Sequence, residues 1–215
     1  MHSADFSALV SPTRGGAVEE YTRFDAEVNY ADVLTRRREV YHEQRDPAPS
    51  AHAGDGAPSI HDLERTSRIN QLPPVDHVDR ALFVDRVVSG DGTHEIASWG
   101  RVAFDVSVAV KTDMVEVVLR GGPGSLEKRL TFKPSGELVV GYRWDAAAFP
   151  PDAVFCTEIS VSRKLALDVP PVPFTTVSRS ESGFEETVQG YSYTQRWPAR
   201  SGEARVTLGA ATMQH

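Results

Sequence analysis

The 215-residue chain contains a single cysteine, Cys156, which excludes an intramolecular disulfide and a cysteine-based zinc site. This cysteine follows Val154 and Phe155 in an apolar run, where a buried and chemically inert thiol is expected. The sequence also lacks an apolar run near the roughly 20 residues that a bilayer requires, and its start lacks a basic, apolar leader. We therefore predict a cytoplasmic protein with no membrane partner.

An excess of basic residues is absent as well. Lys and Arg number 23 against 30 Asp and Glu, which gives a formal charge of −7, and they are scattered except for the triplet at 36–38. A nucleic-acid-binding face normally concentrates positive charge, so no nucleic-acid partner is expected. A neutral ligand such as a glucan is indifferent to this charge, whereas a polyphosphate is repelled by it.

The composition is otherwise that of a globular protein, with 40% hydrophobic and 25% charged residues. This length suits one large β domain, so we predict a single domain over residues 1–215. Residues 46–58, DPAPSAHAGDGAP, have no apolar periodicity and are rich in Pro, Gly and Ala. They predict a mobile surface loop within that domain.

Apolar residues alternate with smaller or polar ones at 101–111, where Val102, Phe104, Val106, Val108 and Val110 share one face. A period of two is typical of a strand with one buried face, so this stretch predicts a half-buried antiparallel strand.

A β-meander is predicted to continue through Trp144. The run 114–120 is rich in branched residues, alternation returns at 126–132, and the breakers at 121–124 and 134–136 force turns between them. Further strands are expected at 152–162, 186–197 and 203–208, with shorter ones at 6–10 and 17–21. The stretch 169–174 carries three prolines and should run extended without central ladder donors. The fold class predicted is all-β, an antiparallel β-sandwich with minor helix.

Chemical motifs are few. No histidine has the spacing of a metal-ligand cluster, the glycines at 121–124 lack the helix and lysine of a phosphate loop, and no serine elbow is present. We therefore assign no catalytic residue, no metal site and no cofactor. The stretch 37–43 is dense in planar hydrogen-bonding groups, and it either binds a sugar or forms an internal polar network. The tryptophans are expected in the core more often than on a sugar-stacking surface.

Four blocks, read in order, carry a family resemblance. They are RGGAVEE at 14–20; Asn29 with DVLTRR at 32–37, Glu39 and YHE at 41–43, followed by SIHDL at 59–63; the run from Asp76 through Arg80 and Phe83 to Asp85; and SESGF at 180–184 with QGYSYT at 189–194. Together they resemble the C-terminal β domain of glycoside hydrolase family 57 glucanotransferases and α-amylases. His77 and Arg86 depart from this pattern, which has Trp and His at those positions.

The resemblance implies a supersandwich similar to the galactose-mutarotase-like fold, packed against a catalytic (β/α) barrel in cis or on a separate chain. It implies a non-catalytic domain that supports the barrel and contacts α-glucan or maltooligosaccharide. The positions that the resemblance assigns to a polar cleft are Arg37, Glu39, His42, His61, Arg80, Asp85 and Glu158.

Two alternatives stay open. The first is a free-standing carbohydrate-binding module. The second is a mutarotase- or epimerase-like enzyme that uses His42, His61 or His94 with Glu158 as acid and base. For Glu158 itself, an unpaired buried carboxylate is costly, so its charge is expected either on a solvated concave face or buried with an arginine partner.

Overall fold

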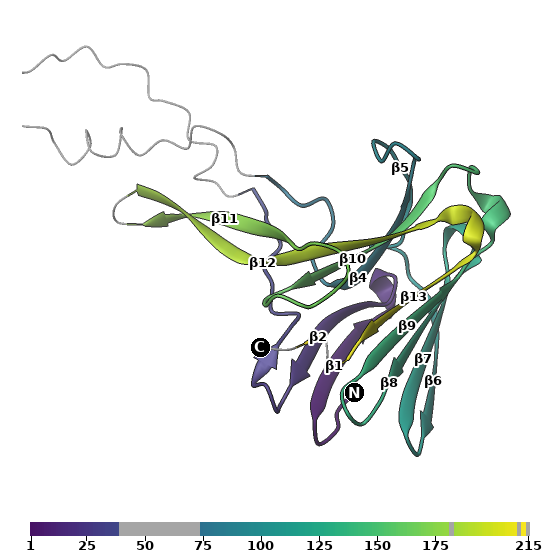
Figure 1. The fold of residues 1–215 in the computed structure, drawn as a ribbon, viewed down its shortest axis with the longest axis horizontal. Helices are drawn as coiled ribbons and strands as arrows, with labels where there is room; N and C mark the ends of the chain where they lie inside the picture. Colours follow the sequence, from purple (N-terminus) through teal and green to yellow (C-terminus); the bar gives the residue numbers. More distant parts are fainter. Residues whose placement is uncertain (39–73, 181–182, 210–211, 214–215) are drawn as a thin grey trace, which may run out of the picture.

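Two antiparallel β-sheets packed face to face make up the protein in a computed structural model, which describes residues 1–38, 74–180, 183–209 and 212–213 (Figure 1). One sheet has eight strands in the order β1-β2-β4-β10-β12-β11, with β3 beside β2 and β5 beside β4, and the other has five in the order β13-β9-β8-β7-β6. Helical turns among the described residues are all short 3-10 turns. The predicted all-β antiparallel sandwich is confirmed.

The strands of the eight-stranded sheet are β1 (Phe6–Ser11), β2 (Ala17–Arg23), β3 (Val28–Asn29), β4 (Leu82–Val88), β5 (Glu95–Ser98), β10 (Val154–Val161), β11 (Val172–Ser180) and β12 (Gly183–Pro198). Those of the five-stranded sheet are β6 (Asp105–Lys111), β7 (Met114–Gly121), β8 (Leu126–Phe132), β9 (Leu138–Arg143) and β13 (Glu203–Leu208).

The five-stranded sheet is the predicted meander, closed by β13. In β8, Leu126, Leu130 and Phe132 are buried while their charged neighbours are partly exposed, because successive side chains of a strand point to opposite faces. Gly122 and Gly124 have positive φ angles in the connection between β7 and β8, which explains why glycines stand there.

The strand β4 lies inside the eight-stranded sheet between β2 and β10, yet its sequence LFVDRVV carries two charges and was not predicted. Its pairing with β10 shifts by one residue, so that Val84 faces Glu158 and Leu82 faces Ile159, which leaves Phe83 as the extra residue of a bulge. Phe83 has a φ of 63°, a left-handed conformation that is rare for a bulky side chain.

Aromatic side chains from both sheets fill the space between them. Trp144 stacks on Phe155 with ring centroids 4.3 Å apart, and the ring of Trp99 lies 5.9 Å from that of Phe155. All three are buried, as is Tyr193. Burial of such large side chains supplies much of the hydrophobic free energy of folding, at about 25 cal/mol per Å² of apolar area. The expectation that the tryptophans lie in the core is confirmed for Trp99 and Trp144, whereas Trp197 is only partly buried.

For the strand predicted at 101–111, the expected burial of one face is wrong over residues 105–111. The strand runs from Asp105 to Lys111, and Val106, Val108 and Val110 are 48%, 60% and 79% exposed. Val106 and Val108 pair with the core residues Leu119 and Val117, so the valines do face the inside of the sandwich. They stay exposed because β6 is the last strand of its sheet and the opposite sheet does not cover it.

In the described part of the chain, no helix is long and apolar enough to cross a membrane.

Candidate functional site: a polar cluster on the outer face of the larger sheet

The central strand β10 presents a polar face to the outside of the sandwich. Phe155 and Ile159 point into the core, so the alternating pattern turns Glu158 and Ser160 to the opposite side. The neighbouring strands place Arg86 of β4 and Ser192 of β12 beside them, since Ser192 pairs with Ser160 and Arg86 pairs with Cys156. The sheet therefore brings polar side chains from three adjacent strands together.

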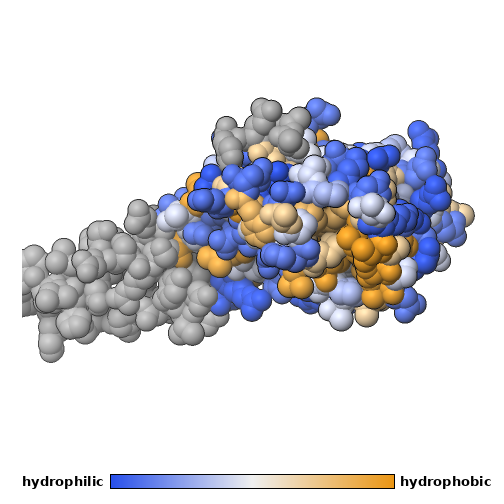
Figure 2. Space-filling model, turned by 90° about the horizontal axis from the view of Figure 1, so that it is seen from below, coloured by the Kyte–Doolittle hydropathy of each residue, from blue (hydrophilic) through white to orange (hydrophobic). Residues whose placement is uncertain are grey.

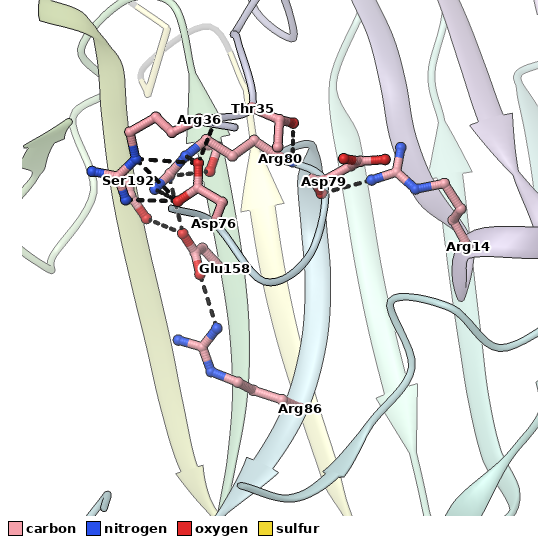
Figure 3. Close-up of polar contacts among 10 residues, drawn as sticks. Arg14, Thr35, Arg36, Asp76, Asp79, Arg80, Arg86, Glu158 and Ser192 are labelled. Carbon is pink, nitrogen blue, oxygen red and sulfur yellow. Dashed lines mark hydrogen bonds and ion pairs between the residues drawn. The ribbon is translucent and has the colours of Figure 1, made fainter. Parts of the chain in front are cut away.

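Glu158 is held by three partners (Figure 3). Arg86 Nη1 donates to its Oε2 at 2.9 Å, while Arg80 Nη1 and the hydroxyl of Ser192 donate to its Oε1 at 3.3 and 2.7 Å. Its side chain is mostly buried. Of the two expectations for this charge, burial with an arginine partner is confirmed.

Arg80 is the centre of the cluster. Its guanidinium donates to both carboxylate oxygens of Asp76, at 2.7 and 2.8 Å, and to the hydroxyl of Ser160 at 3.2 Å. The same group lies 3.9 Å above the ring of Phe174 in β11, a cation–π contact that holds the guanidinium plane against the sheet. A guanidinium group held by both a carboxylate and an aromatic ring is rigid, so the surface around Arg80 is preorganised for binding.

Asp76 joins the cluster to a segment distant in sequence. Arg36 donates to its carboxylate from the backbone amide at 2.8 Å and from Nη2 at 2.6 Å, and the amide of Asp76 donates to the carbonyl of Arg36 at 3.0 Å. The hydroxyl of Thr35 accepts from the amide of Arg80 at 2.9 Å. The segment after β3 and the segment before β4 are therefore clasped together above the sheet.

Both carboxylates of the cluster are held in the ionised form. Burial alone would raise the pKa of Asp76, but hydrogen bonds from Arg36 and Arg80 outweigh it and lower that pKa to about 2. Burial also opposes ionisation of Glu158, yet the hydrogen bond from Ser192 and the charges of Arg86 and Arg80 keep its pKa below the ordinary value. At neutral pH the cluster therefore consists of two ionised carboxylates hydrogen-bonded by the guanidinium groups of three arginines.

A hollow of about 410 Å³ opens at this cluster. Its wall includes Arg36, Asp76, Arg80, Arg86 and Glu158, and the turn between β4 and β5 contributes Gly92 and Thr93 to the other side. The side chain of Arg86 is about one third exposed at its edge. The hollow therefore presents hydrogen-bonding groups, the chemistry that suits a hydroxyl-rich ligand.

The seven predicted cleft residues divide into four groups, of which Asp85 forms one by itself. Arg80 and Glu158 meet in the cluster, whereas Arg37 lies exposed in a contact with Asp79 at 3.0 Å. Glu39, His42 and His61 lie outside the described residues.

Asp85 is the predicted residue with a different environment. Its side chain points into the sandwich and pairs with Lys128 at 2.8 Å, with both groups fully buried. It therefore acts in the core, on the face of β4 opposite to Arg86.

Sequence reasoning missed four members of the cluster, Arg36, Asp76, Ser160 and Ser192, as well as the partner role of Arg86. Asp76 and Arg80 carry opposite charges and stand four positions apart, which is a weak local signal of an ion pair. The pairing of Arg36 with Asp76 spans 40 positions, so no local sequence pattern predicts it.

A second hollow, of about 590 Å³, lies beside the five-stranded sheet around Gly141. A side-chain carbon at Gly141 would have no atom within 4 Å, and the walls include Arg129, Arg143, Arg205 and the half-buried Trp197. Among the described residues, no group of three or more His, Cys, Asp or Glu side chains is placed to hold a metal ion.

The model of the family described as alpha-amylase/4-alpha-glucanotransferase, C-terminal, matches residues 1–166 and 151–208. The chain belongs to this family. The resemblance drawn from the sequence blocks is thereby confirmed over nearly the whole chain.

Curated relatives give the same assignment, and the match covers only part of their length. It is 27% identical to a 4-alpha-glucanotransferase of Thermococcus kodakarensis over 97% of its own length and 38% of that protein. It is 26% identical to an alpha-amylase of Pyrococcus furiosus over 88% of this chain and 34% of the relative. The family domain thus spans little more than a third of the relatives it matches.

A solved structure shares the fold. The crystal structure of 4-alpha-glucanotransferase from Thermococcus litoralis superposes with a TM-score of 0.65 at 21% identity, covering 96% of this chain and 36% of that one. The homologues carry this family domain as one part of a larger enzyme.

Proposed function

We propose that this chain is a non-catalytic accessory domain that supports the catalytic barrel of an α-glucan-processing enzyme and contacts the glucan through the hollow at Glu158. The enzyme class rests on the family and on the short share of each relative that the chain covers. The glucan contact rests on one observation, the rigid network of Arg80, Glu158 and Arg86 along the wall of that hollow.

The state of the cluster carboxylates supports a binding role over a catalytic one. A general acid in glycoside hydrolysis needs a proton to donate near neutral pH, which requires a raised pKa. Asp76 and Glu158 have lowered pKa values and are engaged by guanidinium groups. Locked, ionised carboxylates are suited to accept hydrogen bonds from sugar hydroxyls and to orient the arginines that donate to them.

Arg86 is the side chain best placed to meet a ligand. It uses Nη1 to bind Glu158, and its other nitrogens reach no acceptor in the part of the chain that the structure describes. Those donors stand at the edge of the hollow, where a sugar hydroxyl or ring oxygen can accept from them.

The test is calorimetric titration of the chain with maltoheptaose, on the wild type and on Arg86→Ala. We expect a dissociation constant of roughly micromolar to millimolar, which Arg86→Ala weakens at least about tenfold. Arg205→Ala, an exposed arginine at the second hollow, is the matched control and should leave the affinity unchanged. Absence of heat with the wild type, or loss of binding in Arg205→Ala alone, would overturn the assignment to Glu158.

The non-catalytic part of the proposal has its own assay. The isolated chain should release no product from maltooligosaccharides, and activity should appear when a separately produced catalytic barrel is added. Turnover by the chain alone would refute it.

The two rival functions predict different readouts. A free-standing binding module would bind maltoheptaose and leave the barrel unaffected. A mutarotase would speed the change in optical rotation of a fresh sugar anomer, whereas we expect the uncatalysed rate. Of the three candidate histidines for that reaction, the structure describes His94, which is exposed. Glu158, the candidate carboxylate, hydrogen-bonds to Arg80, Arg86 and Ser192.

A further inference from the structure

The edge strand β6 combines an apolar stripe with a backbone edge that no strand of the described residues pairs with. Val106, Val108 and Val110 lie on one face of it and are half to four-fifths exposed. Figure 2 shows hydrophobic side chains gathered on the right of the molecule, the side on which β6 and β7 lie in Figure 1. An exposed apolar edge strand is a template for pairing with another strand, and proteins usually protect such edges.

The other ends of the two sheets carry that protection. The pairing of β1 with β2 is interrupted by a bulge, with the extra residue in β2. The strand β11 contains Pro173, and its pairing with β12 is interrupted by a bulge, with the extra residue in β12. The strand β13 carries the charged residues Glu203 and Arg205. The strand β6 pairs with β7 in unbroken register and has no proline, bulge or internal charge. Of the four terminal strands β1, β11, β13 and β6 that the structure describes, β6 is the one without such a feature.

The turn after β6 fixes which backbone groups are free. Lys111 pairs with Met114 across the two-residue connection Thr112-Asp113. The pair that closes such a hairpin is hydrogen-bonded, and the bonding alternates along antiparallel strands. Residues 105, 107, 109 and 111 therefore bond to β7, while the N–H and C=O groups of the three valines point outward.

The sequence of β6 is complementary to itself. In an antiparallel pairing of two copies centred on Val108, Asp105 of each copy lies opposite Lys111 of the other, and Val106 lies opposite Val110. Every hydrogen-bonded pair in this register is a valine pair, and the oppositely charged pairs stand at both ends. A register shifted by two residues loses the match between aspartate and lysine.

We propose that two copies of this chain associate along β6 about a two-fold axis at Val108. The two five-stranded sheets then form one continuous ten-stranded sheet, and the valines of both copies join in a single stripe on the inner face. Such an interface is isologous, so it closes at the dimer and leaves no further edge to extend. The partner of β6 is thus a second molecule of the same chain.

Sedimentation equilibrium of the purified chain tests this pairing. The wild type should form a dimer whose population rises with concentration in the micromolar range, and Val108→Lys should be monomeric because it places two lysines opposite each other at the axis. Val172→Lys in β11 is the matched control, since Val172 is 62% exposed, close to the 60% of Val108. It should leave the dimer unchanged.

A charge exchange tests the register. Asp105→Lys and Lys111→Asp, each alone, should weaken dimerisation about tenfold by opposing like charges, and the double variant should restore it. The thermal midpoint of each variant reports any loss of the contact between Lys111 and Glu116 within the hairpin. A double variant no tighter than the singles would refute this register.

The wild type at the highest attainable concentration gives the decisive outcome. A monomer there would overturn the proposal, as would a dimer that Val108→Lys leaves intact. A monomeric wild type whose binding to a separately produced catalytic barrel is lost in Val108→Lys would also overturn it, because the strand would then serve that partner.

Discussion

Lys128 and Asp85 form an ion pair of 2.8 Å between the two sheets, and neither side chain has any exposure to solvent. The lysine comes from β8 and the aspartate from β4. The other two hydrogens of Lys128 Nζ have acceptors in the carbonyls of Phe83, at 2.6 Å, and Gly15, at 3.2 Å. Burial raises the pKa of Asp85 and lowers that of Lys128, and the attraction between them opposes both shifts. The bulge at Phe83 turns its carbonyl out of the ladder and toward the ammonium group.

Removal of Lys128 alone should be severe. Lys128→Met leaves Asp85 buried without its partner, so the free energy of unfolding should fall by about 3–5 kcal/mol in urea denaturation. The double variant Lys128→Met with Asp85→Leu replaces the pair by apolar groups, and it should regain most of that loss. A double variant as unstable as the single one would show that the pair is needed for more than mutual neutralisation.

Glu158→Gln should destabilise the fold through the outer face of the sheet. The amide keeps the shape but removes the carboxylate that binds Arg86 and one of the two that bind Arg80, whose contact with Asp76 remains, which predicts a loss of about 1–3 kcal/mol. Glu203→Gln, at an exposed position of β13, is the control and should change the stability by less than about 0.5 kcal/mol. Equal effects of the two substitutions in the same denaturation assay would contradict this account.

The pH dependence of stability should carry the signature of Asp76. Its pKa is about 2 in the folded protein against 3.8 ordinarily, so its contribution is fully present above about pH 4 and is lost as the pH falls through 2. The unfolding free energies of wild type and Asp76→Asn, measured from pH 2 to pH 6, should therefore converge at the acid end. A difference that stays constant over this range would argue against the ionised form.

Two glycines should respond in opposite ways to alanine. Gly15 has a φ of 62°, and an added Cβ would lie 2.4 Å from the carbonyl oxygen of Trp99, so Gly15→Ala should cost about 2–4 kcal/mol. Gly141 in β9 has open space at its Cβ position, and Gly141→Ala should be neutral or stabilise by up to about 1 kcal/mol. Thermal unfolding of both variants beside the wild type measures the contrast, which similar midpoints would refute.

Periodicity predicted strands well where one sheet covers the other. The bounds 203–208 of β13 match the prediction, and β8 alternates as expected, because one face of each is buried. It failed at β4, whose Asp85 and Arg86 disrupt the apolar pattern and are neutralised by Lys128 and Glu158, far away in the sequence. The predicted burial of β6 was wrong for a related reason. Whether the opposite sheet covers a strand depends on the tertiary structure and cannot be inferred from the local sequence pattern.

The candidate site was predictable in part. The sequence left two alternatives for Glu158, a solvated face or burial with an arginine partner, because an unpaired buried carboxylate is costly, and the second is the one observed. The identity of that partner was not predictable, because Arg80 and Arg86 are contributed by another strand and the segment leading into it. Arg36 reaches the cluster only because the fold returns the chain beside Asp76.

The hydrogen bonds between Arg36 and Asp76 have a consequence for how the protein tolerates changes in chain length. Backbone and side-chain hydrogen bonds join Arg36 and Asp76 across 40 positions of sequence. The ends of the intervening stretch are held together whatever its length, and the entropic cost of closing a loop grows only slowly with length. An engineered change in the length of the sequence between these two residues is therefore expected to cost little stability.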